Sequence, residues 1–148
     1  MVLFQGSRSP GDGTTSHSAM NAFDATEQAS ALLATEPPPE GTRDPRWQAL
    51  LVVTSYIQHE PELVWEFIEE WGGHEREDIR EAVATCLLEP LLERHCVDFL
   101  TLIAERAISD TFFADMFLRC ERFGSAAEPP FAKRFDALRR QLTEKFFD

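Results

Sequence analysis

The stretch "HEREDIREAVATCLLEPLL", residues 74–92, decides the fold of this chain. Its apolar side chains recur with the period of an α-helix, and its carboxylates stand near the start, where the helix dipole favours negative charge. The predicted buried side of this helix comprises Ile79, Ala82, Val83, Cys86, Leu87 and Leu91. Pro90 has no N–H to donate to the carbonyl of Cys86, so we expect the helix to bend there.

The flanking segments show the same helical period, and none alternates in the way a β-strand does. Asp44-Pro45 begins one predicted helix, and Pro61 begins the next, which Gly72-Gly73 ends. Three consecutive prolines place a linker at residues 35–44. The sequence therefore predicts an all-α fold of about seven helices. They are the opening stretch and residues 24–34, 45–58, 61–71, 97–108, 111–123 and 130–146.

Residues 1–19 are expected to lie outside the fold. "LFQG" at residues 3–6 resembles the remainder of a viral-protease cleavage site, and the small polar residues after it resemble a polylinker. We therefore expect an expression-tag remnant at 1–19 and a single helical domain at 20–148. A hydrophobic content of 43% supports one core and argues against a disordered chain.

The sequence indicates neither a membrane anchor nor an oxidising compartment. No apolar run approaches the roughly 18 residues of a membrane span, and no charged segment followed by an apolar one marks a signal peptide. Cys86, Cys96 and Cys120 are odd in number and lack a Cys-x-x-Cys spacing, so neither a disulfide framework nor a zinc site is expected. These features fit a cytoplasmic protein without a membrane partner.

The net charge of −12 is unevenly distributed along the chain. Residues 20–118 contain 20 acidic and 6 basic side chains, whereas residues 119–148 contain 5 acidic and 7 basic ones. A field of this sign repels phosphate backbones and anionic lipid, and it attracts basic surfaces. The composition therefore favours a basic protein partner over a nucleic acid or a membrane.

A pair of charged residues recurs at predicted helix starts. Asp44-x-Arg46 and Asp78-x-Arg80 are 34 residues apart, and Asp110 stands at a third helix start 32 residues further on. Helix pairs at such a period are typical of stacked helical repeats.

Asp78-x-Arg80-x-Ala82, with the apolar run after it, resembles the second-helix signature of the HEAT repeat family. The resemblance is weaker at Asp44 and Arg46 and covers roughly half of the chain. It implies a right-handed stack of antiparallel helix pairs, a short HEAT-like α-solenoid of about three pairs with the N-terminal helix as a cap. It also implies that these Asp and Arg residues form a structural ladder between repeats. The whole chain is similar to small bacterial HEAT-like proteins of unassigned role.

Four glutamates on one side of the helix at 61–71 form an acidic ridge: Glu62, Glu66, Glu69 and Glu70. No Lys or Arg occurs between Trp47 and Glu75, so this helix forgoes the i,i+4 ion pairs of most solvated helices. Three interpretations stay open: a solvated face, a docking surface for a basic partner, and a metal or acid–base site. The last lacks the Glu-x-x-His pattern of di-metal bundles, because His74 lies beyond the glycine break.

Trp65 adjoins Glu62, Glu66 and Glu69 in helical geometry. A docking surface needs an aromatic or apolar anchor. We therefore expect Trp65 to be partly exposed at the centre of the contact, with Trp71 buried in the apolar stripe. The alternative is that Trp65 packs against the preceding helix.

No nucleophile elbow, Walker loop, dinucleotide-binding glycines or zincin pattern occurs in the sequence. We predict a non-enzymatic protein-binding module without catalytic residue, metal or cofactor. Its most concrete form is an immunity or inhibitor protein that covers the positive cleft of a nucleic-acid-directed toxin. The alternative is a nucleic-acid-binding or DNA-repair protein, since some HEAT-like proteins are alkyl-base glycosylases. Its phosphate contacts would come from Lys133, Arg134, Arg139, Arg140 and Lys145. The oligomeric state stays open.

Overall fold

A computed structural model describes residues 20–147, so the expected tag remnant at residues 1–19 lies outside the described residues. The described part is helical and contains no β-strand, which confirms the predicted all-α class. No helix within it is both long enough and apolar enough to cross a bilayer. The elements are α1 (Ala22–Leu33), α2 (Pro45–Thr54), α3 (Pro61–Trp71), α4 (Glu77–Val83), the π-helical segment η1 (Ala84–Leu88), α5 (Glu89–Ala107), α6 (Thr111–Leu118), the 3₁₀ segment η2 (Gly124–Ala127) and α7 (Phe131–Phe146).

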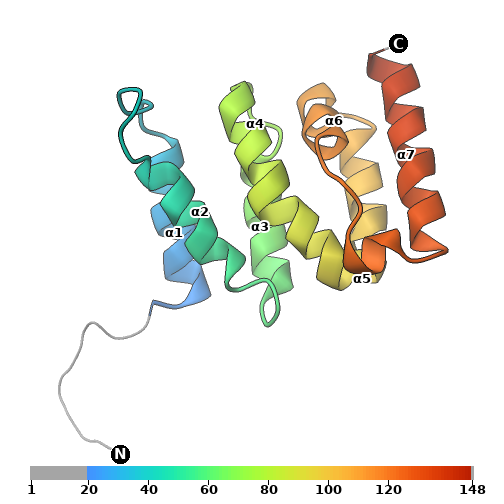
Figure 1. Cartoon of the computed structure of the whole chain (residues 1–148), viewed down its shortest axis with the longest axis horizontal. Coiled ribbons are helices and arrows are strands. Elements are labelled where there is room, and N and C mark those ends of the chain that lie inside the picture. Colours follow the sequence, from blue (N-terminus) through green and yellow to red (C-terminus); the bar gives the residue numbers. More distant parts are fainter. Residues whose placement is uncertain (1–19, 148) are drawn as a thin grey trace, which may run out of the picture.

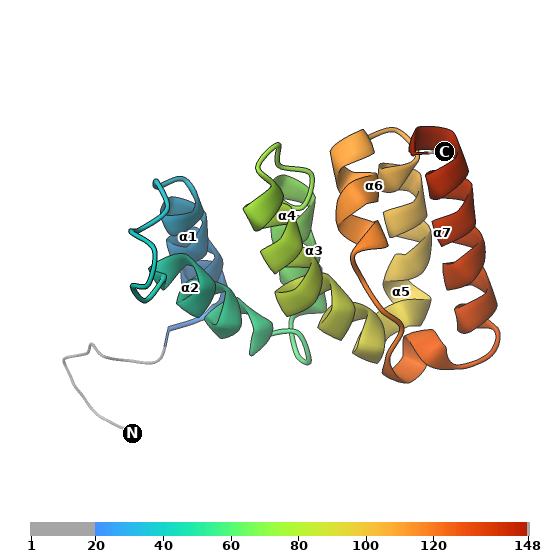
Figure 2. The ribbon, with the colours of Figure 1, turned by 45° about the horizontal axis from the view of Figure 1, so that its top comes forward.

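The pairs α1 and α2, α3 and α4, and α5 and α6, followed by α7, succeed one another along the long axis of the molecule (Figure 1). α1 contacts α2, α3 contacts α4, α5 contacts α6, and α7 packs against both α5 and α6 at the far end. Figure 2 shows the same succession from a second direction, with α7 beside α5. Apolar side chains from neighbouring helices form one connected core. Within it Phe117 and Phe135 join α6 to α7, with ring centroids 4.8 Å apart.

Most helix starts lie where the caps and prolines predict them. Asp44 and Asp110 each accept a hydrogen bond from a backbone N–H of the first turn, at 3.0 and 3.1 Å, and Pro45 opens α2. The start of α1 differs: the helix begins at Ala22 instead of residue 24, and its N-cap is Asn21. An Asn side-chain oxygen satisfies a free N–H of the first turn about as well as an Asp does.

Residues 77–107 form one uninterrupted helical run, where the sequence predicted two helices. Counted as uninterrupted runs, the described residues therefore contain six α-helical stretches instead of about seven. The run changes direction at His95, whose φ of −134° and ψ of 35° leave the helical region. The imidazole Nε2 of His95 lies 3.0 Å from the carbonyl oxygen of Ile57, just beyond the end of α2.

The break at His95 has a visible cause in η2. The backbone N–H of Cys96 donates to the hydroxyl of Ser125 at 3.3 Å, and that hydroxyl donates to the carbonyl of Leu92 at 2.8 Å. In an unbroken helix this N–H and this carbonyl would bond each other, so the hydroxyl has been inserted into the ladder. Gly124 permits the approach: it has a φ of +55°, and a Cβ there would lie 2.7 Å from the carbonyl oxygen of Glu93.

The bend predicted at Pro90 is not found at that residue. The helix widens into the π-helical turn η1, which ends two residues before the proline, and the change of direction lies at His95 instead. A π turn shifts the hydrogen-bond register and so accommodates the missing N–H. The carbonyl of Cys86, which Pro90 deprives of its helical partner, accepts a hydrogen bond from the Thr54 hydroxyl of α2 at 2.7 Å. A side chain of the neighbouring helix thus compensates for the proline.

Candidate functional site

Three glutamates of the acidic ridge are free to meet a partner and the fourth is engaged. Glu62, Glu66 and Glu70 are exposed on α3. Glu69 is half-buried, and Arg106 of α5 donates to its backbone carbonyl at 3.1 Å and lies 3.8 Å from its carboxylate. An exposed ion pair of this length contributes little to stability. It does place a positive charge beside Glu69, so the accessible negative charge is concentrated on the other three.

The expectation that Trp65 is partly exposed is wrong, since its exposed fraction is 7%. Its ring packs against Phe99 of α5 with centroids 5.8 Å apart, and it meets Phe113 of α6 edge-on at 6.1 Å. The physical reason is that the following helices, not solvent or the preceding helix, cover this side of α3. Trp65 is therefore a core residue and cannot serve as the anchor of a docking surface.

Trp71, expected to be buried, is only half-buried. Its indole N–H donates to the hydroxyl of Ser30 on α1 at 3.0 Å, and its ring stacks on His74 with centroids 5.5 Å apart. A tryptophan with one polar edge satisfied and one face covered suits the boundary between core and solvent. Relative to the prediction, the buried stripe of α3 is rotated from Trp71 toward Trp65.

A groove of about 520 Å³ runs between α1 and α3, on the side of α3 that carries part of the ridge. Each helix contributes four lining residues at the spacing i, i+3, i+4 and i+7, which is one face of an α-helix. They are Phe23, Thr26, Glu27 and Ser30 on α1 and Leu63, Glu66, Phe67 and Glu70 on α3. The groove therefore combines three carboxylates with three large apolar side chains.

Phe23 is the exposed aromatic residue of this groove, with an exposed fraction of 58%. Phe23 was not identified from the sequence, because only the tryptophans beside the ridge were considered as aromatic anchors. A signal was present: α1 buries Ala22, Ala25, Ala29 and Leu33, and Phe23 falls outside that stripe. A large aromatic side chain off the buried stripe of a short helix is one that a partner can desolvate.

Arg46 links the first two helix pairs. It is almost fully buried, and it bonds the cap residue Asp44 at 2.8 Å and Asp78 at the start of α4 at 3.2 Å. Hydrogen bonds from Arg46 hold the pKa of Asp44 below its usual value. One nitrogen, Nη1, has no hydrogen-bond partner among the described residues, and the guanidinium lies over the ring of Trp47, 4.3 Å from its centroid. These contacts are those expected of a link between successive helix pairs.

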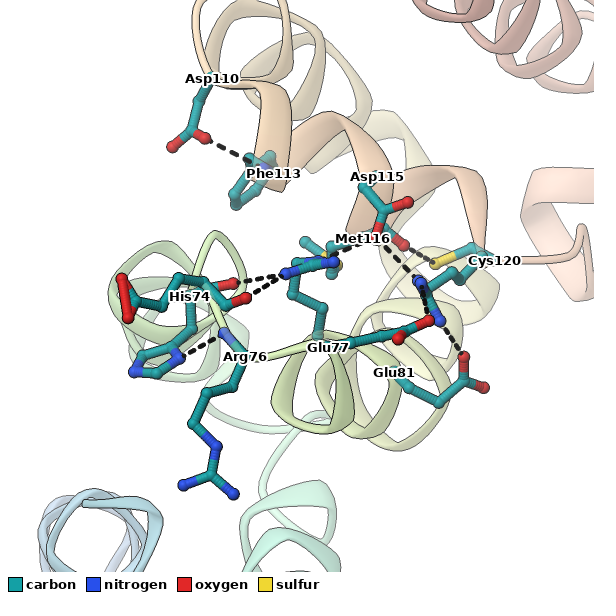
Figure 3. A network of polar contacts seen from close by, with 12 residues as sticks. His74, Arg76, Glu77, Glu81, Asp110, Phe113, Asp115, Met116 and Cys120 are labelled. Atoms are coloured by element: carbon teal, nitrogen blue, oxygen red, sulfur yellow. Dashed lines mark hydrogen bonds and ion pairs between the residues drawn. The ribbon is translucent and has the colours of Figure 1, made fainter. Parts of the chain in front are cut away.

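Arg80 of α4 makes the corresponding link to Asp115 of α6. Figure 3 shows the network of polar contacts around Asp115. The Arg80 guanidinium donates to Asp115 at 2.8 Å and to the backbone carbonyls of His74 and Glu75 at 3.0 and 2.8 Å. Asp115 also accepts from Arg119 at 2.9 Å. Burial raises the pKa of Asp115, but the hydrogen bonds from the two arginines outweigh it and hold that pKa below its usual value. The acidic partner is Asp115 within α6, not Asp110 at its start.

Arg119 lies at the outer edge of the same network. It pairs with Glu77 and Glu81 of α4 at 2.8 and 2.7 Å, and both carboxylates are largely in solvent. The hydrogen bond to Glu77 is the main cause that raises the pKa of Arg119. Of the four sequence-predicted ladder residues, Arg46, Asp78 and Arg80 contact a second helix, whereas Asp44 bonds Arg46 of the helix that it caps. None of the four lines the groove.

The cysteines show no sign of nucleophilic chemistry. All three are free thiols, with Cys96 and Cys120 buried and Cys86 half-buried. Burial raises the pKa of each thiol above its usual value, most strongly for Cys120. A protonated thiol is a poor nucleophile and a poor metal ligand. Within residues 20–147, no three His, Cys, Asp or Glu side chains are placed to hold a metal ion.

The basic residues of α7 divide into an exposed set and an engaged one. Lys133, Arg140 and Lys145 are exposed. Arg134 is exposed but donates to the hydroxyl of Thr101 at 2.8 Å, and Arg139 donates to a backbone carbonyl of the preceding loop at 2.6 Å. α7 therefore carries exposed basic side chains, and it lies at the opposite end of the described residues from α1 (Figure 1).

Comparison of the chain with protein-family models, with curated proteins and with solved structures gives no match. Information about function therefore comes from the surface of the molecule. That surface offers an acidic groove with an apolar floor at one end and a basic helix face at the other.

Proposed function

We propose that this chain is a non-enzymatic protein-binding module, a short HEAT-like solenoid whose acidic surface docks the basic surface of a partner protein. The observation behind the proposal is the groove between α1 and α3, which Glu27, Glu66 and Glu70 line together with Phe23. Charge complementarity speeds the encounter and selects the partner, and an aromatic side chain that loses its water supplies affinity. Both elements are present within one groove.

The solenoid part of the proposal is supported by the links between helix pairs. Arg46 reaches Asp78 across one junction, and Arg80 reaches Asp115 across the next. Repeated contacts between neighbours only are typical of stacked helical repeats. In its most concrete form the module is a cytoplasmic bacterial immunity or inhibitor protein, which covers the positive cleft of a toxin that acts on nucleic acid.

Charge reversal tests this function. A variant with Glu62→Lys, Glu66→Lys and Glu70→Lys should lose salt-sensitive capture of basic proteins from a bacterial lysate. A control with Glu36→Lys, Glu40→Lys and Glu105→Lys has the same net charge, alters exposed residues elsewhere and should still capture them. Identical captured proteins from the wild type and the ridge variant, identified by mass spectrometry, would contradict the proposal.

A second candidate function is nucleic-acid binding through α7, and its outer basic face favours it. The net charge of −12 opposes it, because a phosphate backbone must approach through a negative field. An electrophoretic shift of duplex DNA at physiological salt, abolished by Lys133→Glu with Arg140→Glu, would place this function first. We expect no shift.

A further inference from the structure

The groove between α1 and α3 has the geometry of a site for a third helix. Both helices start at the lower edge in Figure 1 and run in the same direction. Each presents residues at i, i+3, i+4 and i+7 to the groove, the pattern by which helices pack on one another. A span of seven residues rises about 10 Å, which is two helical turns.

The side chains in the groove divide by chemistry into a floor and a rim. Phe67 is buried, Leu63 is half-buried, and Phe23 stands 58% exposed at one side, so the floor is apolar. Glu27, Glu66 and Glu70 are exposed and make no ion pair with any residue in the described range. An amphipathic helix with an apolar stripe and flanking lysines or arginines matches both parts.

We propose that this groove binds a basic amphipathic α-helix of a partner protein, about two turns of which lie between α1 and α3. An apolar side chain of that helix covers Phe23 and Phe67, and basic side chains one turn away on either side meet Glu27, Glu66 and Glu70. The inference rests on the proposed function and specifies the shape of the partner. An extended basic loop would satisfy the charges without placing a helical apolar stripe over Phe23 and Phe67.

Two acetylated, amidated peptides of about 20 residues test the proposal, because isolated helices shorter than about 12–15 residues are marginal in water. The first peptide is amphipathic, with leucines on one face of the helix and lysines beside them. The second has the same composition, but its leucines and lysines are distributed around the whole helix, so it is not amphipathic. Fluorescence anisotropy measures both affinities at low salt. The first peptide should bind at least about tenfold more tightly than the second.

Variants locate the site. Phe23→Ala should weaken binding of the first peptide about fivefold or more, and Glu66→Lys with Glu70→Lys about tenfold or more with a smaller salt dependence. Phe147→Ala and Glu105→Lys remove an exposed aromatic and an exposed carboxylate elsewhere, and they should change the affinity less than about twofold. All of these side chains are exposed, and an unchanged melting temperature verifies that each variant is folded.

Four results would overturn the inference. Equal binding of the two peptides would mean that the groove recognises charge alone. The proposed docking function would then stand, but the partner segment would not need to be helical. Absence of binding by both peptides, or binding that survives the Phe23 and Glu66 changes, removes the groove as a helix site. Concentration-dependent self-association, abolished by Lys133→Glu with Arg140→Glu, would assign the groove to α7 of a second copy instead.

Discussion

Arg80 and Arg119 each bond three partners, yet we expect their removal to have very different effects on stability. Arg80→Met keeps the aliphatic stem and removes one bond to Asp115 and two to backbone carbonyls. The Arg80 side chain is 10% exposed and its carboxylate partner 26%. A charge-assisted bond contributes about 1.5–3 kcal/mol and each backbone bond up to about 1 kcal/mol. Since Asp115 retains Arg119, the loss in unfolding free energy should be about 3 kcal/mol.

Arg119→Met is the matched comparison, because Asp115 then retains Arg80. The other two partners of Arg119 are the carboxylates of Glu77 and Glu81, which are 72% and 54% exposed. Water replaces such bonds readily, so this change should cost about 1 kcal/mol or less. The number of partners is equal, and burial decides the difference.

Urea unfolding followed by circular dichroism measures both variants at neutral pH, with equal slopes required for the comparison. At about 3–4 °C per kcal/mol for a domain of this size, Arg80→Met should lower the melting temperature by about 10 °C and Arg119→Met by less than about 4 °C. A cost for Arg119→Met equal to or greater than that for Arg80→Met would refute the reasoning, because burial would then not control the energy of these bonds.

Three further predictions concern the same core. The pKa of Asp115 is lower in the folded protein than its ordinary value near 3.8, so the stability that Asp115 contributes is present above that value and is lost as the pH falls through the folded pKa. Asp115→Asn should therefore make the free energy of unfolding depend less on pH in this acidic window. An unchanged pH dependence would contradict the assignment. Thr54→Val should lower the free energy of unfolding by about 1–2 kcal/mol, and by less in a Pro90→Ala background, where a backbone N–H again reaches the carbonyl of Cys86. A double-mutant cycle without coupling between the two changes would argue that Thr54 does not compensate for Pro90. Labelling of the native protein with an aromatic disulfide reagent should modify Cys86 first and slowly, because the other two thiols are buried; a fast phase that survives Cys86→Ala would show that a buried thiol opens readily.

Local sequence rules predict the helices well where a single residue type controls the backbone. Proline at the start of α2 and α3 and the caps Asp44 and Asp110 all lie where they were expected. Helix ends were placed less well: α2 ends at Thr54 and α6 at Leu118, each shorter than predicted. Apolar residues continue past both ends in the sequence, and periodicity does not distinguish a helix from a turn that packs on the core.

The break at His95 was beyond prediction because its cause lies far away in the chain. The Ser125 hydroxyl bonds the carbonyl of Leu92, 33 residues away in the sequence, and no pattern near His95 indicates this contact. The prediction that Trp65 is partly exposed was wrong for a related reason. Helical period places it beside Glu62 and Glu66, but whether solvent or a neighbouring helix covers that side depends on the tertiary arrangement. The acidic ridge needed only composition and period, and its exposed part is where the sequence placed it.

The inserted Ser125 hydroxyl has a consequence for the order of assembly during synthesis. When residues 77–107 leave the ribosome, η2 is still inside the exit tunnel, so Cys96 and Leu92 are free to bond each other. The nascent segment then favours one straight helix of about 46 Å, and the turn at His95 forms only when Gly124 and Ser125 arrive. A chain shortened after Arg119 should therefore keep the straight form and leave apolar surface of α5 and α6 uncovered. Residues emerging late from the ribosome determine the path of a helix made well before them.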